Sequence, residues 1–238
     1  MSVVALPERI DVVFCDVGGP IYSDDNFTTA ILHALDEMRA ERGRPPVDRV
    51  EYSVLYDAMR SAQSGGFRVT LARELLGDAD LTPELHARTA PWWTHPEGTA
   101  YADALPMFRA LHGYVTTGVV ANQEAATVDA LTRDGFGDVI DVWGISALVG
   151  HEKPSREFFD WALDRAGTTA EHAVHIGNRL DTDVRPARAL GLGTIWVTRG
   201  EAPDLPTPEQ VAEADLTVPD LMTVADVVLP RARVRRVG

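Results

Sequence analysis

The sequence predicts an α/β fold, in which a Rossmann-like parallel sheet forms the core and an α-helical cap is inserted near the start of the chain. Three observations support this prediction. Residues 10–15 form a short, apolar, β-branched run that is typical of a buried parallel strand. A long stretch with helical periodicity follows it. From Tyr101 onward helical and strand patterns alternate, which is typical of a parallel sheet with helices on both faces.

Residues 23–96 are the predicted cap. Its first helix begins at Asp25 and Asn26, residue types that favour helix starts. The apolar face of that helix would consist of Phe27, Ile31, Leu32, Leu35 and Met38. The second helix would carry Val50, Val54, Leu55 and Met59 on one apolar face. Shorter helical stretches at 71–76 and 83–90 complete the cap, which leaves residues 1–22 and 97–238 for the core.

The alternation of helices and strands in the core predicts that the carboxyl ends of the strands lie along one edge of the sheet. Helices are expected at 102–111, 125–133, 154–166 and 183–190, and strands at 117–120, 145–149, 173–176 and 194–197. Right-handed crossovers bring the carboxyl ends of parallel strands to one edge of the sheet, where ligands bind. The residues that follow the strands are therefore the candidates for a functional site.

The composition narrows the choice of partner and compartment. A net charge of −14 argues against non-specific nucleic-acid binding but not against a small anionic substrate, because a local site can oppose the overall charge. No window is apolar over enough residues to span a bilayer. A single cysteine, Cys15, and a polar start over residues 1–11 predict a cytoplasmic protein. The arginines after residue 230 predict a solvated tail or, alternatively, a contact for an acidic partner.

Chemically capable residues follow several predicted strands. Asp16 ends the first strand beside Gly18 and Gly19, and Ala121 and Asn122 end the second. Lys153, the only lysine of the chain, precedes a helix, and the run 177–183 after a later strand contains Asn178, Asp181 and Asp183. A rigidly held aspartate with small neighbours suits nucleophilic attack, although a loop aspartate can also simply cap a turn.

In order, spacing and context, these residues resemble the four motifs of the haloacid dehalogenase (HAD) superfamily, and the resemblance covers essentially the whole chain. It implies that Asp16 is the nucleophile and that Lys153 and Asp183 are the other catalytic residues. It also implies that Gly18, Gly19, Ala121 and Asn122 lie at the substrate. The Mg²⁺ site that it implies would consist of Asp16, the Gly18 carbonyl, Asn178 and Asp183.

The sequence departs from the family pattern at four positions. Gly18 replaces the aspartate that serves as general acid and base in family phosphatases, and Pro20 replaces a threonine. Ala121 replaces a hydroxyl residue, and Asn178 replaces the aspartate that ligates magnesium. Magnesium is held largely by carboxylate charge, so we expect weak Mg²⁺ binding or none. We also expect reduced or atypical activity, because positioned acid–base groups typically contribute a hundredfold or more.

Three functions remain open from the sequence, and the first is favoured. The protein would be a phosphatase-type hydrolase that acts through Asp16 on a small phosphorylated metabolite. Alternatively, it is a catalytically silent or repurposed member of the fold that binds a metabolite or partner. A further alternative is a metal-independent haloacid dehalogenase, for which Arg68 would be the cap arginine. For Arg68 itself, a solvated residue at a helix start is the favoured interpretation.

Four aromatic residues near the predicted site have open roles. Trp92 and Trp93 would point about 100° apart on a helix, so one of them either lines the cleft or packs beside the hinge. His151 is a candidate for the site, whereas His175 alternates within a strand and is expected to be a core histidine with its polar atoms satisfied.

Overall fold

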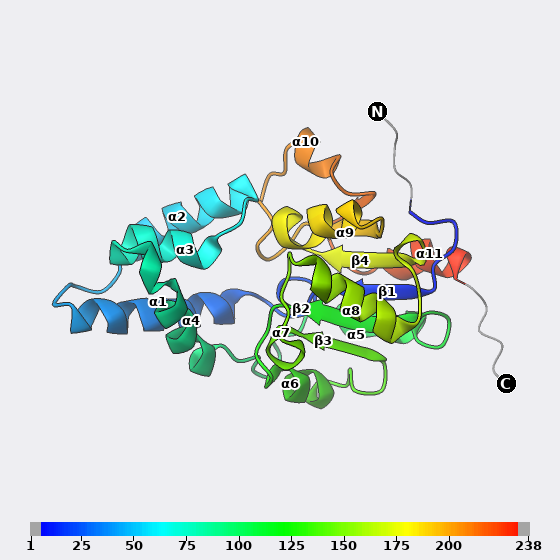
Figure 1. Cartoon of the computed structure of the whole chain (residues 1–238), viewed down its shortest axis with the longest axis horizontal. Helices are drawn as coiled ribbons and strands as arrows, with labels where there is room; N and C mark the ends of the chain where they lie inside the picture. Colours follow the sequence, from blue (N-terminus) through cyan, green and yellow to red (C-terminus); the bar gives the residue numbers. More distant parts are fainter. Residues whose placement is uncertain (1–5, 233–238) are drawn as a thin grey trace.

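The computed structural model describes residues 6–232, which fold into a six-stranded parallel sheet with helices on both faces and a separate group of helices at one side (Figure 1). The strands lie in the order β3-β2-β1-β4-β5-β6. Their bounds are Val12–Cys15 for β1, Thr116–Ala121 for β2, Val142–Ile145 for β3, Ala173–Gly177 for β4, Gly193–Val197 for β5 and Leu216–Val218 for β6. The predicted fold class is confirmed.

Alternate residues of the central strand serve the two faces of the sheet. Val13 and Cys15 pack with α5 (Ala104–Leu111), α6 (Thr127–Arg133) and α11 (Val224–Val228). Val12 and Phe14 pack with α8 (Arg156–Ala166) and α9 (Arg185–Ala189) on the other face. Because β1, β2, β4 and β5 are buried over their whole length, they read in the sequence as continuous apolar runs.

One predicted strand was wrong. Residues 145–149 were expected to be extended, but β3 ends at Ile145, and Ser146–Val149 form one helical turn, α7, that Gly150 ends at a φ of 80°. A short apolar run does not separate a strand from a helical turn by periodicity. The edge strand β6 was not predicted, since three residues are too few to show alternation.

The helices α1 (Asp25–Glu41), α2 (Arg49–Ala62), α3 (Phe67–Leu71) and α4 (Thr82–Thr89) have a hydrophobic cluster of their own, apart from the sheet (Figure 1). A π-helical turn, Ala72–Leu76, contributes Leu75 and Leu76 to it. The expected apolar face of the second helix was partly wrong. Leu55 and Met59 pack against this cluster, but Val50 and Val54 are 72% and 67% exposed, while Tyr52 is buried. The domain boundaries at 22/23 and 96/97 stay a prediction.

Two adjacent segments connect this helical group, which we call the cap, to the sheet. Tyr22 and Ala100 form an antiparallel bridge, and Tyr101 donates its backbone N–H to the Ile21 carbonyl at 2.8 Å. The Tyr22 ring stacks on His95 with 4.3 Å between ring centroids. The two segments therefore form a paired hinge.

A second connection joins the end of α2 to the loop after β5, residues 198–204. Gln63 donates its amide to the Glu201 carbonyl at 2.8 Å and accepts the Leu180 N–H at 2.8 Å. Arg60 donates to the Ala202 carbonyl at 2.7 Å. Further along the same loop, the Arg199 guanidinium donates to the carbonyls of Gly19 and Pro20.

Within residues 6–232, none of the helices has the length and apolar character that a membrane crossing requires. Of the arginines in the predicted tail, Arg231 donates to the Val227 carbonyl at 2.7 Å. Arg233, Arg235 and Arg236 lie outside the described residues.

Candidate functional site

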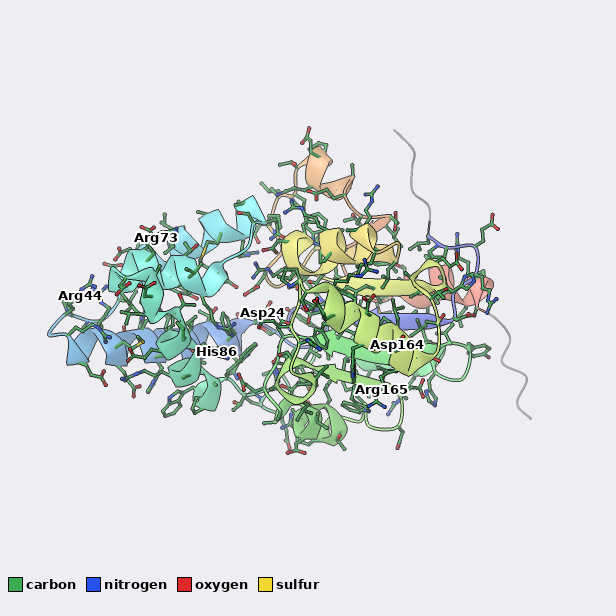
Figure 2. The ribbon with its side chains drawn as sticks, viewed as in Figure 1. Asp24, Arg44, Arg73, His86, Asp164 and Arg165 are labelled. Carbon is green, nitrogen blue, oxygen red and sulfur yellow. The ribbon has the colours of Figure 1, made fainter. Side chains whose placement is uncertain are left out.

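The candidate site lies at the carboxyl edge of the sheet, where the cap faces the ends of β1, β2 and β4. A cavity of about 680 Å³ separates the two parts. Figure 2 shows Asp24 between the cap helices and the sheet, and His86 on the cap side of the same space. Core residues that line the cavity include Asp16, Gly18, Asn122, Gln123, Lys153 and Asn178. Cap residues that line it include Phe27, Phe67, Arg68, His86 and Trp93.

A buried ammonium joins two of the predicted catalytic carboxylates. Lys153 Nζ lies 2.8 Å from Asp16 Oδ1 and 2.5 Å from Asp183 Oδ1. Burial by itself would lower the pKa of Lys153, but the charges of Asp16 and Asp183 raise it above its usual value. Lys153 therefore stays charged beside the cavity.

Asp183 does not face the cavity. Its side chain is fully buried, and its Oδ1 accepts from Lys153 and from His175 Nε2 at 3.0 Å, while Oδ2 accepts the Arg179 N–H at 3.0 Å. Although burial acts to raise the pKa of Asp183, Lys153 and His175 hold it well below its usual value. The structure thus places Asp183 behind Lys153, where it can position the lysine but cannot contact a substrate.

Asp16 has a different environment from Asp183. Its side chain is 13% exposed and lines the cavity. Burial raises the pKa of Asp16, and the charge of Lys153 opposes part of that rise, which leaves the pKa at about 6. Near neutral pH the carboxylate is ionised and only partly neutralised, as a nucleophile requires.

Both polar atoms of the Asn122 side chain form hydrogen bonds within the protein. Its Nδ2 donates to the Lys153 carbonyl at 2.8 Å, and its Oδ1 accepts the Lys153 N–H at 2.7 Å. The side chain was expected to contact substrate; although it lines the cavity, both of its polar atoms already hold the backbone that carries the lysine.

Two residues expected at the substrate are elsewhere. Ala121 is fully buried, and its methyl packs in the hydrophobic core beneath the sheet edge. Gly19 donates its N–H to the Tyr22 carbonyl at 2.8 Å, and a Cβ there would lie 1.9 Å from Asn178 Nδ2. Neither lines the cavity, whereas Gly18 does. The glycine at 19, with a φ of +85°, is needed for close packing and for its left-handed backbone.

The predicted magnesium ligands do not form a donor set that suits the ion. Both Asp183 oxygens are occupied by Lys153, His175 and the Arg179 N–H, which removes this residue as a ligand. Asn178 contributes no charge, and its Nδ2 faces Asp24 Oδ2 at 3.4 Å and the Arg199 carbonyl at 3.3 Å. Over residues 6–232 no group of three His, Cys, Asp or Glu side chains is arranged to hold a metal. The structure therefore does not fit a strongly held Mg²⁺, and weak or absent binding stays a prediction.

Arg68 provides an unpaired cation in the cap wall. It lies over the rings of Phe27 and Trp93, 5.3 Å from each centroid, and makes no ion pair with any carboxylate of residues 6–232. Its buried Nε lacks a hydrogen-bond partner there, and burial lowers the pKa of Arg68. Of the two readings left open for this residue, a solvated helix start was wrong: α3 turns the side chain into the cavity. By contrast, Arg179 is neutralised by Asp181 and Glu201.

Of the other aromatic candidates, one lines the cavity and three do not. Trp93 lines the cavity, whereas Trp92 is exposed and stacks on His33. His151 is exposed and borders a shallower hollow beside the cavity, away from Asp16. His175 is buried as expected, and its Nε2 bonds to Asp183, which makes it a support for the site. The expectation that all its polar atoms are satisfied was wrong, because its buried Nδ1 has no hydrogen-bond partner within residues 6–232.

Asp24, which lies beside the hinge residue Tyr22, is in the cavity wall, a position that the sequence analysis did not predict. A Cβ built on Gly18 would lie 3.0 Å from Asp24 Oδ1. Burial raises the pKa of Asp24 well above its usual value, and the charges of Glu201 and Asp16 raise it further. No local signal marks this residue, because Asp24 precedes a helix, where aspartate is common for capping.

Comparisons with known proteins agree with the motifs and the fold. A family model described as HAD-hydrolase-like matches residues 151–224. The phosphoserine phosphatase of Thermus thermophilus is 34% identical over 173 residues, which cover 69% of this chain and 66% of that protein. The glyceraldehyde 3-phosphate phosphatase of Methanocaldococcus jannaschii is 33% identical over 116 residues, 49% of this chain and 48% of that protein. The matched part thus spans about half the length of that relative.

Solved structures resemble most of the chain in fold. The HAD-hydrolase YfnB of Bacillus subtilis, in a magnesium-bound form, superposes with a TM-score of 0.65 at 19% identity and covers 92% of this chain and 99% of its own. A 2-haloacid dehalogenase of Pseudomonas syringae superposes with a TM-score of 0.56 at 21% identity, covering 92% and 98%. The chain belongs to the haloacid dehalogenase superfamily.

Proposed function

We propose that this protein is a hydrolase of the phosphatase type, which acts through Asp16 on a small phosphorylated metabolite. The observation that carries the proposal is the Asp16–Lys153 pair, which faces a cavity whose opposite wall holds the unpaired Arg68. Similarity to proteins named as phosphatases supports the reaction class. Small anionic molecules, rather than nucleic acid or membranes, are the proposed partners, because the rest of the chain is acidic.

In the proposed reaction, a carboxylate oxygen of Asp16 attacks the phosphorus, and the bond from phosphorus to the ester oxygen breaks. Lys153 holds the attacking carboxylate in place and offsets the negative charge that gathers on the phosphoryl oxygens. Water then attacks the phosphoryl group on Asp16 and releases inorganic phosphate. Gly18 has no side chain for the proton transfers in these steps.

The surrounding residues have supporting roles in the proposal. Arg68 binds an anionic group of the substrate from the cap side, and closure of the cap excludes water from the phosphoryl group. Asn122 and Asp183 are positioning residues, since the polar atoms of Asn122 bond to the backbone of Lys153 and Asp183 bonds to its ammonium. No step is assigned to a metal, because the donor set does not suit one.

A metal-independent dehalogenase is the second candidate, and the position of Arg68 in the cavity favours it. In that reaction Asp16 would attack the carbon that bears the halogen, halide would leave, and Lys153 would neutralise charge. Water would then hydrolyse the ester that forms on Asp16.

Hydrolysis of a panel of phosphorylated metabolites and of a 2-haloacid tests both candidates. The native protein and Asp16→Asn are compared with magnesium and with chelator, and exposed Asp25→Asn serves as a control for a charge change in the same region. Phosphate release that Asp16→Asn abolishes and Asp25→Asn retains supports the phosphatase. Halide release in chelator supports the dehalogenase. No turnover of any compound at high protein concentration contradicts both and favours a binding role.

A further inference from the structure

Because residue 18 is glycine, the space beside it is free of its own side chain, and the carboxylate of Asp24 fills that space. A Cβ on Gly18 would meet two atoms, Asp24 Oδ1 at 3.0 Å and Gln123 Nε2 at 3.3 Å. An aspartate at position 18 would direct its carboxylate into this same region. The Asp24 carboxylate, which comes from a different turn of the chain, thus lies in the space next to residue 18, where the family's second aspartate would place its side chain.

The Asp24 side chain is not used for the local purpose that its position suggests. Asp24 is the residue before α1, yet its carboxylate makes no capping bond to that helix. Instead, Oδ2 faces the Asn178 amide at 3.4 Å, and the backbone N–H of Glu201 also donates to the carboxylate. A carboxylate directed away from its own helix and into a cavity is a candidate for chemistry.

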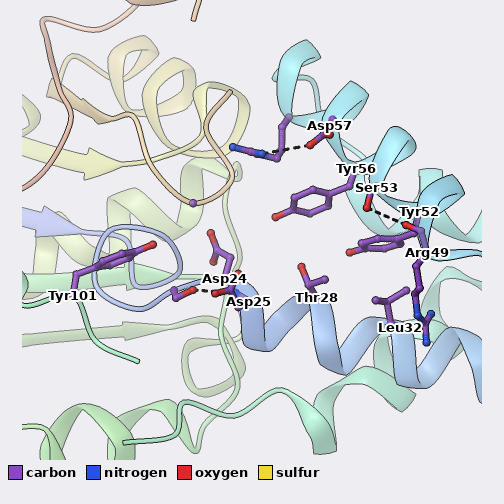
Figure 3. Close-up of a pocket in the computed structure, with 13 residues that line it drawn as sticks. Asp24, Asp25, Thr28, Leu32, Arg49, Tyr52, Ser53, Tyr56, Asp57 and Tyr101 are labelled. Carbon is purple, nitrogen blue, oxygen red and sulfur yellow. Dashed lines mark hydrogen bonds and ion pairs between the residues drawn. The ribbon is translucent and has the colours of Figure 1, made fainter. Parts of the chain in front are cut away.

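The surrounding backbone makes room for this carboxylate. A Cβ on Gly200 would lie 2.3 Å from Asp24 Oδ2, so the loop after β5 approaches Asp24 closely only because residue 200 is glycine. Figure 3, a close-up of a second cavity of about 510 Å³ that Asp24 also lines, shows Asp24 at the start of α1, between the cap helices and the loops of the core. Asp24, Gly18 and Asp16 all line the 680 Å³ cavity.

We propose that Asp24, from the hinge, is the general acid and base of the reaction, in place of the absent side chain at residue 18. This inference rests on the proposed phosphatase function. While Asp16 forms its bond to phosphorus and the ester bond breaks, the protonated Asp24 gives its proton to the leaving oxygen. In the second step Asp24, now ionised, takes a proton from the water that attacks the phosphoryl group on Asp16. Phosphate leaves, and Asp24 is again protonated.

The test compares two leaving groups in native protein and Asp24→Asn. An alkyl phosphate needs a proton on its leaving oxygen, whereas 2,4-dinitrophenyl phosphate releases a stable phenolate without one. We expect Asp24→Asn to lower alkyl phosphate turnover by about 100-fold or more. Dinitrophenolate should still be released in a first burst at the native rate, followed by slow turnover while the phosphoryl group stays on Asp16. The exposed neighbour variant Asp25→Asn should behave as native protein.

A rescue experiment separates chemistry from structure. Gly18 does not have a left-handed backbone, so an aspartate fits there once the Asp24 carboxylate is removed. The double variant Gly18→Asp/Asp24→Ala should recover alkyl phosphate turnover by about tenfold or more relative to Asp24→Ala. Circular dichroism and thermal melting of each variant establish that it is folded.

Other outcomes overturn the inference. If Asp24→Asn hydrolyses the alkyl phosphate at the native rate, Asp24 is not the acid. If the first burst of dinitrophenolate slows as much as alkyl phosphate turnover and the double variant does not recover, Asp24 serves structure, substrate binding or a metal. Both results leave the phosphatase function standing, because native turnover is measured alongside. Absence of native turnover on either ester contradicts the proposed function and this inference together.

Discussion

The side chain of Asn122 bonds both polar backbone atoms of Lys153, accepting its N–H at 2.7 Å and donating to its carbonyl at 2.8 Å. Asn122 directly follows β2, and Lys153 follows β3 and α7. The two bonds therefore join the loop after β2 to the loop after α7, at the point where the Lys153 ammonium enters the site. The distance from Lys153 Nζ to Asp16 therefore depends on a residue that contributes no charge.

We expect Asn122→Ala to lower kcat more than it changes KM, because the lysine loses its fixed backbone. Loss of two bonds to partly buried backbone groups should also lower the free energy of unfolding by about 1–3 kcal/mol. Asn122→Asp retains the acceptor for the Lys153 N–H but not the donor, so its kcat should be intermediate. Steady-state kinetics and urea unfolding check both expectations. Equal kcat in all three proteins would show that Lys153 holds its position without Asn122.

The pH dependence of kcat/KM should report on Asp16. Its pKa of about 6 lies above that of an ordinary aspartate, and the attacking form is ionised, so activity should fall as pH decreases through about 6. Lys153→Met removes the charge that opposes burial, so the remaining activity should fall at a higher pH. Circular dichroism at each pH excludes acid unfolding. An acid limb near pH 4 in the native protein would contradict the partly neutralised environment described for Asp16.

Arg68→Ala should raise KM for an anionic substrate by about 10- to 100-fold, because one charge-assisted hydrogen bond contributes about 1.5–3 kcal/mol. Arg73→Ala is the matched control: this cap arginine is exposed, pairs with its neighbour Glu74 and points away from the cavity (Figure 2). The inhibition constant of inorganic phosphate, measured for both variants, tests binding apart from turnover. Equal effects of the two variants on KM would show that Arg68 does not bind the substrate.

Gln63→Ala should destabilise the closed arrangement of cap and core. The Gln63 side chain is buried, and its loss leaves the Leu180 N–H and the Glu201 carbonyl without their partner, at a cost of about 1–3 kcal/mol. Gln210→Ala removes an exposed bond between the same two parts, from Gln210 to the Ser61 carbonyl, and an exposed bond from the Thr207 N–H at its own helix start, and should cost less. Hydrogen exchange of residues 198–204 should accelerate in the first variant only. Similar exchange in both would show that the buried bond does not fasten the cap.

The sheet was largely predictable because its chemistry is local. Strands such as Val12–Cys15 are buried on both faces and are therefore uniformly apolar in the sequence. The run 145–149 is equally apolar but turns into a helix at Ser146, and nothing in its periodicity marks that change. Val50 and Val54 failed for a related reason: helical spacing identifies a face, but the neighbouring elements decide whether that face is covered.

The candidate site was only partly predictable. Asp16 and Lys153 were expected to meet because both follow strands of one sheet edge, and they lie 2.8 Å apart. The burial of Ala121 in the hydrophobic core and of Asp183 behind Lys153 depends on which side chains point below the edge, which the motif order does not specify. Asp24 reaches Gly18 only through the path of the hinge, so its position could not be read from local pattern.

The loop after β5 touches the hinge through Arg199, the site through Gly200 and the end of α2 through Ala202. A shift of this one loop would be transmitted to all three places at once, and substitutions at 199, 200 and 202 should therefore combine non-additively. For protein engineering, substitutions at residues 199 and 202 should therefore change how firmly the cap is held against the core, without altering Arg68 and Trp93, which line the cavity.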